Sequence, residues 1–193
     1  MTSPDRPVSP WNIANVVTVA RIFLVPVFAV FVALSGMEHS GWRMAACALF
    51  VFISATDFVD GWLARSRNLV TDFGKIADPI ADKALIGTAL VLLSYYGDLS
   101  WWVTGIILVR ELGITAWRMA VLRRTVIAAD RGGKLKTVLQ ITAVAWYLWP
   151  WPGPLDAVGP WLMGAAVVLT VLTGMDYLWK AFKSKESEPN RTS

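Results

Sequence analysis

The sequence predicts an all-α integral membrane protein, a bundle of six transmembrane helices with both termini in the cytoplasm. Of its 193 residues, 55% are hydrophobic and only 17% are charged, and the mean hydropathy is +0.51. A soluble domain carries a larger charged share. Several apolar windows also approach or exceed the roughly 20 residues that cross a hydrocarbon core of about 30 Å. The clearest of these windows are 16–34 and 155–177.

Six apolar segments, separated by proline, glycine and charged residues, are expected to be helices. They are 15–34, 42–65, 73–96, 99–122, 135–149 and 160–182. The fifth is short and contains Gln140, so it needs a less apolar extension to span. Together they form one membrane domain, 15–182, after a cytoplasmic N-terminal segment, 1–14. The polar tail, 183–193, is expected to be disordered.

The basic residues indicate which side of the membrane holds the termini. With six spans, both termini lie on the same side. Thirteen Lys and Arg residues fall on that side, and only Arg43 falls on the other. Since basic residues accumulate on the cytoplasmic side, the termini are expected there, in a multi-pass protein of the inner cell membrane. The net charge of +4 is therefore mainly a topology signal that also favours anionic lipid, and it does not require a nucleic-acid partner.

Four carboxylates stand out in the stretch "TDFVDGWLARSRNLVTDFGKIADPIADK", residues 56–83. Asp57 and Asp60 lie near the end of the second expected helix, and Asp78 and Asp82 lie near the start of the third. The spacings of three and four residues put each pair on one side of its helix. Because the two helices run in opposite directions, the pairs are expected to converge at the cytoplasmic side, where the active site would face the cytoplasm.

Four like charges at a membrane boundary are costly, so something must offset them. One interpretation is local neutralisation by Lys83 and Arg65. The other is metal binding, because carboxylates without His or Cys suit hard cations such as Mg²⁺, Mn²⁺ or Ca²⁺. Four carboxylates are enough for two metal ions, and a two-metal site at a membrane surface suggests phosphoryl chemistry.

Small residues lie one helical turn from these carboxylates. Gly61 and Ala64 follow Asp60, and Gly74 precedes Asp78. They either leave room for a flat or bulky group or allow close packing of helices.

With its spacing, the stretch reads Asp57-x2-Asp60-Gly61-x2-Ala64-Arg65-x8-Gly74-x3-Asp78-x3-Asp82. It resembles the signature of the CDP-alcohol phosphatidyltransferase family at all eight positions. The resemblance implies a CDP-linked lipid donor, CDP-diacylglycerol, and release of CMP when an alcohol attacks the lipid-side phosphorus. It implies that the four aspartates bind two divalent ions, Mg²⁺ or Mn²⁺, and that Asp82 also acts as the general base. Gly61, Ala64 and Gly74 would make room for the cytidine nucleotide, with Arg65 near its phosphates. A homodimer is also expected.

A second group of charged residues bears on the acceptor alcohol. Arg110 and Arg118 are eight residues apart, so they fall on roughly one face of the fourth helix. Lys134 and Lys136 lie where the fifth helix begins. Such a set suits an acceptor that carries a phosphate. The alternative is an internal pair of Arg110 with Glu111 or Asp176, with lysines that extend to the interface.

Three stretches are most similar to the branch of the family that makes phosphatidylglycerol phosphate. They are "NIANVVTVARIFLVPVF" from Asn12, "RELGITAWR" from Arg110 and "GKLKTVLQ" from Gly133. In that branch the acceptor is sn-glycerol 3-phosphate. Asn15, Thr18 and Arg21 recur every three residues, so they either line the site or form a hydrogen-bonded seam between helices.

Two kinds of alternative remain open. Within the family, the acceptor could be an inositol phosphate or phosphatidylglycerol, which would give a phosphatidylinositol-phosphate or a cardiolipin-forming enzyme. Outside it, a non-catalytic membrane protein could bind divalent cations through the aspartates.

Overall fold

The computed structural model describes residues 13–66, 72–121 and 131–186. For 13–15, 59–66, 72–76, 117–121, 131–134, 178 and 180–186, only the helical backbone is described.

Six α-helices make up the described chain. They are α1 (Ile13–Ser35), α2 (Ser40–Ser66), α3 (Asp72–Tyr95), α4 (Trp101–Val121), α5 (Arg131–Leu148) and α6 (Val158–Glu186), with a 3₁₀ turn, η1 (Gly153–Ala157), before α6. The six expected helices are confirmed. α5 begins four residues earlier than expected, and α6 continues to Glu186, four residues into the expected polar tail. Its last residues, "KSKE", include Lys and Glu, which favour helix.

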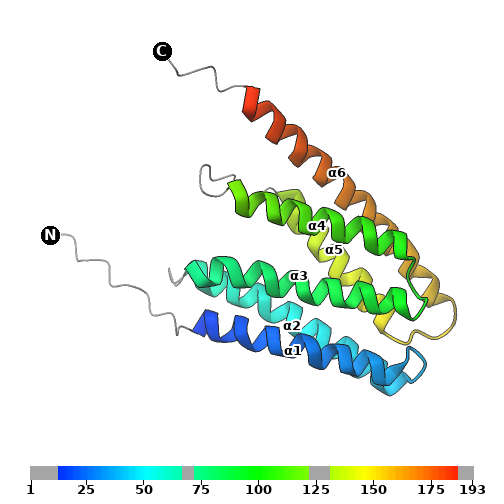
Figure 1. Ribbon diagram of the computed structural model, residues 1–193. Helices are drawn as coiled ribbons and strands as arrows, with labels where there is room; N and C mark the ends of the chain where they lie inside the picture. The colour runs from blue at the N-terminus through cyan, green and yellow to red at the C-terminus, as the bar shows by residue number, and fades with distance from the viewer. Residues whose placement is uncertain (1–12, 67–71, 122–130, 187–193) are drawn as a thin grey trace, which may run out of the picture.

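Successive helices run in opposite directions (Figure 1). The starts of α1, α3 and α5 therefore lie at the same end of the bundle as the ends of α2 and α4, and α6 runs in the direction of α2 and α4 but diverges from the other helices toward its C-terminus. The packing is most extensive between α1 and α2, between α5 and α6, and between α1 and α3. The second half of α2 and the first half of α3, which carry the aspartates, consequently lie at the same end.

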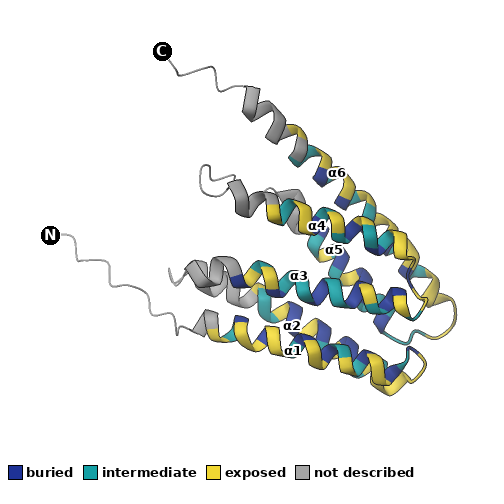
Figure 2. Cartoon of the chain, viewed as in Figure 1, coloured by how far each residue is buried: buried dark blue, intermediate teal, exposed yellow. Residues whose placement is uncertain are grey.

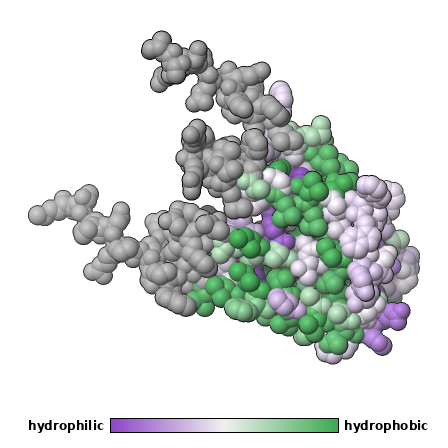
Figure 3. All heavy atoms as spheres, in the orientation of Figure 1, coloured by the Kyte–Doolittle hydropathy of each residue, from purple (hydrophilic) through white to green (hydrophobic). Residues whose placement is uncertain are grey.

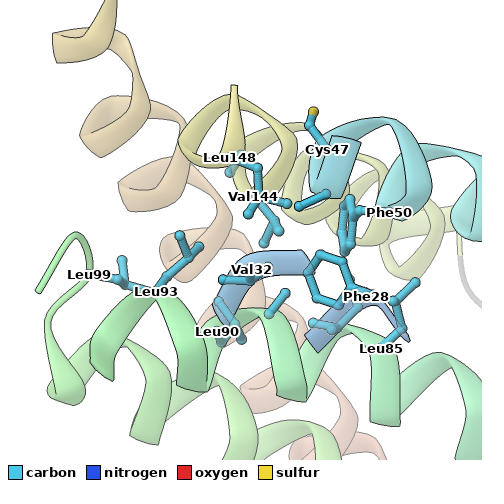
Figure 4. Packing of buried hydrophobic residues seen from close by; sticks show 14 of the residues in the cluster. Phe28, Val32, Cys47, Phe50, Leu85, Leu90, Leu93, Leu99, Val144 and Leu148 are labelled. Carbon is cyan, nitrogen blue, oxygen red and sulfur yellow. The ribbon is translucent and has the colours of Figure 1, made fainter. Parts of the chain in front are cut away.

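The core lies where α1, α2, α3 and α5 meet (Figure 4). Phe28 of α1 packs against Phe50 of α2, with ring centroids 5.6 Å apart. Leu90 of α3 and Val144 of α5 are fully buried in the same cluster. Buried residues gather on the inward faces of the helices, and exposed residues lie on the outward faces (Figure 2). Packing of these apolar side chains thus holds α1, α2, α3 and α5 together.

Apolar side chains cover much of the described surface in view (Figure 3). Phe23, Val109 and Met175 are examples of large apolar side chains with most of their surface exposed. Three helical segments are long and apolar enough to cross a membrane, namely Val16–Ser35, Ser40–Phe58 and Gly153–Tyr177. α3 carries charged residues in its first half and α4 in its second half, and the apolar part of α5, Leu135–Leu148, is shorter. The chain is a helical membrane protein.

Arg43 of α2 joins the helices at the end opposite the aspartates. Its guanidinium donates to the carbonyl oxygens of Tyr147 at 2.8 Å, Leu148 at 3.3 Å and Met37 at 3.2 Å. The carbonyls at the end of a helix lack partners within the helix, so a cation there satisfies them and also interacts favourably with the helix dipole. Arg43 therefore caps the C-terminus of α5 and links it by hydrogen bonds to the α1–α2 connection.

We expect Arg43→Gln to lower the free energy of unfolding by about 2 kcal/mol, since it removes charge-assisted hydrogen bonds from a half-buried site. The measurement is the thermal unfolding of purified protein in detergent. Arg43→Lys is the matched control, because it keeps the charge but loses the planar fork of donors, and it should fall between the two. A glutamine variant as stable as the wild type would contradict the capping role of Arg43.

Candidate active site

The site is built from three helices at the end of the bundle where α1 and α3 begin. α2 contributes Asp57, α3 contributes Asp78 and Asp82, and α1 contributes Thr18 and Arg21. The residues on α1 are three positions apart, so one face of α1 carries both. Asp57 of α2 and Asp78 of α3 contact Arg21 and Thr18, which lie one turn apart on α1, and Asp82 lies one turn after Asp78, so the aspartates of α2 and α3 lie at the same end of the bundle, as expected.

α1 contacts these carboxylates directly. The Thr18 hydroxyl donates to Oδ1 of Asp78, and the Arg21 guanidinium forms an ion pair with Oδ1 of Asp57. Thr18 and Arg21 are each only 2% exposed. The face of α1 that carries them therefore lines the aspartate cluster, and its hydrogen bonds also join the helices. The expected hydrogen-bonded contacts between helices are present for Thr18 and Arg21, and a role of this stripe in lining the substrate site stays a prediction.

Asp82 is paired within its own helix. The ammonium of Lys83 lies 3.1 Å from Asp82 Oδ2. Local neutralisation by Lys83, one of the two interpretations of the carboxylates, is thus seen for Asp82. Arg65, the other cation suggested for this role, has a side chain outside the described residues.

The donor atoms fit hard divalent cations. Asp57, Asp78 and Asp82 offer only carboxylate oxygens, the ligands that Mg²⁺ and Mn²⁺ prefer. No three acidic, His or Cys side chains within the described ranges are close enough together to hold one ion. Asp60, which the sequence adds to this set, lies outside the described side chains. So do the other predicted site residues Asn15, Gly61, Ala64, Gly74, Arg118 and Lys134.

A second polar cluster lies beside the first, between α3, α4 and α5. At its centre is Glu111 of α4, whose side chain is 6% exposed. One carboxylate oxygen, Oε2, lies 2.8 Å from the Lys83 ammonium. The other, Oε1, accepts from Lys136 of α5 and, at 2.9 Å, from Arg110.

The sequence left two interpretations of Arg110, and the ion pair with Glu111 is present. Arg110 also donates to the Thr173 hydroxyl of α6 at 2.9 Å. Lys136 is 3% exposed, so its ammonium does not extend to an interface as the alternative suggested. The connection from Asp82 through Lys83 to Glu111 was not predicted from the sequence. An acidic residue inside an apolar helix, which needs cationic partners, was the available signal.

Together, the fold and the site define a helical membrane protein with an acidic, oxygen-lined centre and a buried cluster of cations next to it. The family model for CDP-alcohol phosphatidyltransferase matches residues 11–172. The chain belongs to this family and is a CDP-alcohol phosphatidyltransferase.

Similar proteins are found in several bacteria. The chain is 49% identical over 172 residues to "Probable phosphatidylglycerophosphate synthase" of Mycobacterium tuberculosis (strain H37Rv). The aligned residues make up 89% of this chain and 82% of the relative. It is 36% identical to "CDP-diacylglycerol--glycerol-3-phosphate 3-phosphatidyltransferase" of Bacillus subtilis, over 90% of this chain and 98% of the relative. A protein of the same name from Rickettsia typhi is 37% identical, with the same coverage.

Proposed function

We propose that this protein transfers the phosphatidyl group of CDP-diacylglycerol to sn-glycerol 3-phosphate, giving phosphatidylglycerol phosphate and CMP. The observation that carries the proposal is similarity over about nine-tenths of the chain to relatives whose names specify this donor and acceptor. The aspartates of α2 and α3 supply a chemically suitable centre beside a cluster of cations. Both substrates meet in this reaction at a membrane surface, which suits a helical membrane protein.

In the proposed reaction, a hydroxyl oxygen of the acceptor attacks the phosphorus that carries the diacylglycerol group. A new P–O bond forms, the pyrophosphate P–O bond to CMP breaks, and CMP leaves with the bonding electrons. Asp82 accepts the hydroxyl proton, which a positioned carboxylate can do despite its low basicity. Lys83 engages Oδ2 of Asp82 and so restrains the carboxylate.

Asp57, Asp60, Asp78 and Asp82 would hold two divalent cations, Mg²⁺ or Mn²⁺. When bound, such ions neutralise phosphate charge and lower the pKa of a coordinated hydroxyl. Thr18 and Arg21 orient the carboxylates of Asp78 and Asp57 from α1. Partners that orient metal ligands in this way commonly change metal affinity 10- to 100-fold. Gly61, Ala64, Arg65 and Gly74 would receive the cytidine nucleotide, by resemblance to the family signature.

We further propose six membrane spans with the site and both termini on the cytoplasmic side. α5 is the shortest helix, with 18 residues or about 27 Å, and α4 has 21 residues or about 31 Å. All six are therefore long enough to cross or nearly cross a core of about 30 Å. The charged residues of α3, α4 and α5 contact one another inside the bundle, which lowers their cost in a bilayer. The bias of basic residues supports the orientation.

The acceptor phosphate would bind to Arg110, Arg118, Lys134 and Lys136. Arg110 and Lys136 already meet at one carboxylate oxygen, so two of these four cations are close together. Arg118 lies two helical turns beyond Arg110, toward the end of α4 that joins the aspartate end of the bundle. An arginine there would bind phosphate with two parallel hydrogen bonds.

Arg118→Ala is expected to raise the KM for glycerol 3-phosphate at least about tenfold, because it removes a charge-assisted contact to the phosphate. The KM for CDP-diacylglycerol should change little. Steady-state kinetics with each substrate varied in turn measures both, with Arg118→Lys as the control that keeps the charge. An unchanged KM for the acceptor would show that Arg118 is structural.

One assay tests the function itself. Purified protein receives CDP-diacylglycerol and Mg²⁺ or Mn²⁺, and CMP release is measured with glycerol 3-phosphate, inositol phosphate or phosphatidylglycerol. Release with glycerol 3-phosphate alone supports the proposal. Faster CMP release with inositol phosphate or phosphatidylglycerol would mean that glycerol 3-phosphate is not the preferred acceptor. Cation binding without CMP release in any mixture would favour a non-catalytic cation-binding protein.

A further inference from the structure

We propose that Glu111 is a positioning residue for the acceptor phosphate: its carboxylate holds Lys83, Arg110 and Lys136 in one cluster beside Asp82. This inference rests on the proposed function, since it assigns a role within the same site. Glu111 does not touch the substrates in this proposal. It acts through the cations that it binds.

The contacts of Glu111 connect three helices. Lys83 comes from α3, Arg110 from α4 and Lys136 from α5. The carboxylate has two oxygens and uses both, Oε2 toward Lys83 at 2.8 Å and Oε1 toward the other two cations. Side-chain exposure is 4% for Lys136 and 6% for Glu111, so water competes little for the contact between these two residues.

The charge balance explains why a carboxylate is needed here. Three cations without an anion would repel one another strongly in a poorly solvated site, and a lone buried charge is costly. Glu111 removes one unit of this excess and leaves a net positive cluster for an incoming phosphate. A preformed cluster costs less to organise when the phosphate binds, which increases affinity.

The same carboxylate also governs the environment of Asp82. Lys83 lies between two acceptors, 2.8 Å from Glu111 Oε2 and 3.1 Å from Asp82 Oδ2. If Glu111 were neutral, Asp82 would be the remaining ion-pair partner of Lys83 among the described residues, and Lys83 would pair with it more closely. A small pocket between α3, α4 and α5 is lined by both Asp82 and Glu111, together with Gln140. Gln140 is 3% exposed, and its amide nitrogen has no hydrogen-bond partner among the described residues.

The test is a kinetic comparison of Glu111→Gln with the wild type. Glutamine keeps the size of the side chain but cannot act as an anionic partner for three cations. The KM for glycerol 3-phosphate should rise at least about tenfold, as expected for loss of charge-assisted hydrogen bonds. The KM for CDP-diacylglycerol should change less than about twofold. The inhibition constant of inorganic phosphate, competing with glycerol 3-phosphate, should rise by a similar factor.

Two further variants separate positioning from general destabilisation. Glu111→Asp keeps the charge on a shorter side chain, so its KM for glycerol 3-phosphate should lie between those of the wild type and Glu111→Gln. Glu38→Gln makes the same chemical change at an exposed residue of the α1–α2 connection, at the opposite end of the bundle, and should behave as wild type. Thermal unfolding of each variant shows whether the purified protein is folded.

The outcomes are distinct. A folded Glu111→Gln protein with an unchanged acceptor KM, or with equal rises for both substrates, overturns the inference. If Glu111→Gln does not fold, the test is whether Glu111→Asp raises the KM for glycerol 3-phosphate more than the KM for CDP-diacylglycerol. If neither variant folds, Glu111 has a structural role and the inference is overturned. A wild-type protein that releases no CMP with glycerol 3-phosphate instead overturns the proposed function.

Discussion

Asp82→Asn is expected to lower turnover by about 10³-fold or more while much of the binding of CDP-diacylglycerol is retained. Asparagine has nearly the same shape, and its amide oxygen can still accept from Lys83. It cannot take up the proton of the acceptor hydroxyl, because a neutral amide is not a base at ordinary pH. The variant therefore tests proton removal with little change in packing.

The measurement combines CMP release with equilibrium binding of the donor lipid, over a range of Mn²⁺ concentrations. If Asp82 acted only as a metal ligand, saturating Mn²⁺ would restore much of the rate, whereas loss of the base persists at any concentration. Asp156→Asn is the matched control, since Asp156 is an exposed aspartate of η1 at the other end of the bundle. Wild-type rates in Asp82→Asn would remove Asp82 as the base.

The helices could be predicted from the sequence because the signal is local. Long apolar windows interrupted by glycine, proline and charge define all six, and the largest errors, of four residues, are at the start of α5 and the end of α6. The convergence of Asp57 with Asp78 and Asp82 could also be predicted, because antiparallel neighbouring helices bring the end of one to the start of the next. Spacing of three or four residues was sufficient for this inference.

Partners that lie on other helices could not be predicted. Arg21 pairs with Asp57 across 36 residues of chain, and Lys136 pairs with Glu111 across 25. Such pairs depend on how α1 rotates against α2 and how α5 rotates against α4. Rotation is decided by side-chain packing in the core, such as that of Phe28 on Phe50, and not by spacing along one helix. The sequence therefore indicated which residues were available but left their pairing open.

Removing divalent cations with a chelator should abolish turnover reversibly and leave the fold largely intact. Activity should be lost because the proposed ions neutralise the charge of the donor pyrophosphate and lower the pKa of the acceptor hydroxyl. The fold should persist because protein groups already offset the carboxylates: Arg21 contacts Asp57, Thr18 contacts Asp78 and Lys83 contacts Asp82. Mg²⁺ or Mn²⁺ should restore the rate, and Zn²⁺ should restore it poorly, since the ligands are oxygen atoms only.

Arg21→Gln is the informative variant for this prediction. Without Arg21, the half-exposed Asp57 loses its cationic partner, so the chelated protein should lose about 1–2 kcal/mol of stability relative to the chelated wild type. Metal binding then supplies the missing positive charge, and by linkage it should raise the unfolding temperature more in Arg21→Gln than in the wild type. Thr18→Val, which removes only a neutral donor to Asp78, should show a smaller difference. The measurement is the unfolding temperature of each protein with EDTA and with excess Mn²⁺. Equal metal-induced shifts of the unfolding temperature in wild type and Arg21→Gln would mean that Arg21 does not offset the charge of Asp57. Unfolding of the wild type on chelation would mean that the cations, not the protein partners, hold the aspartates together.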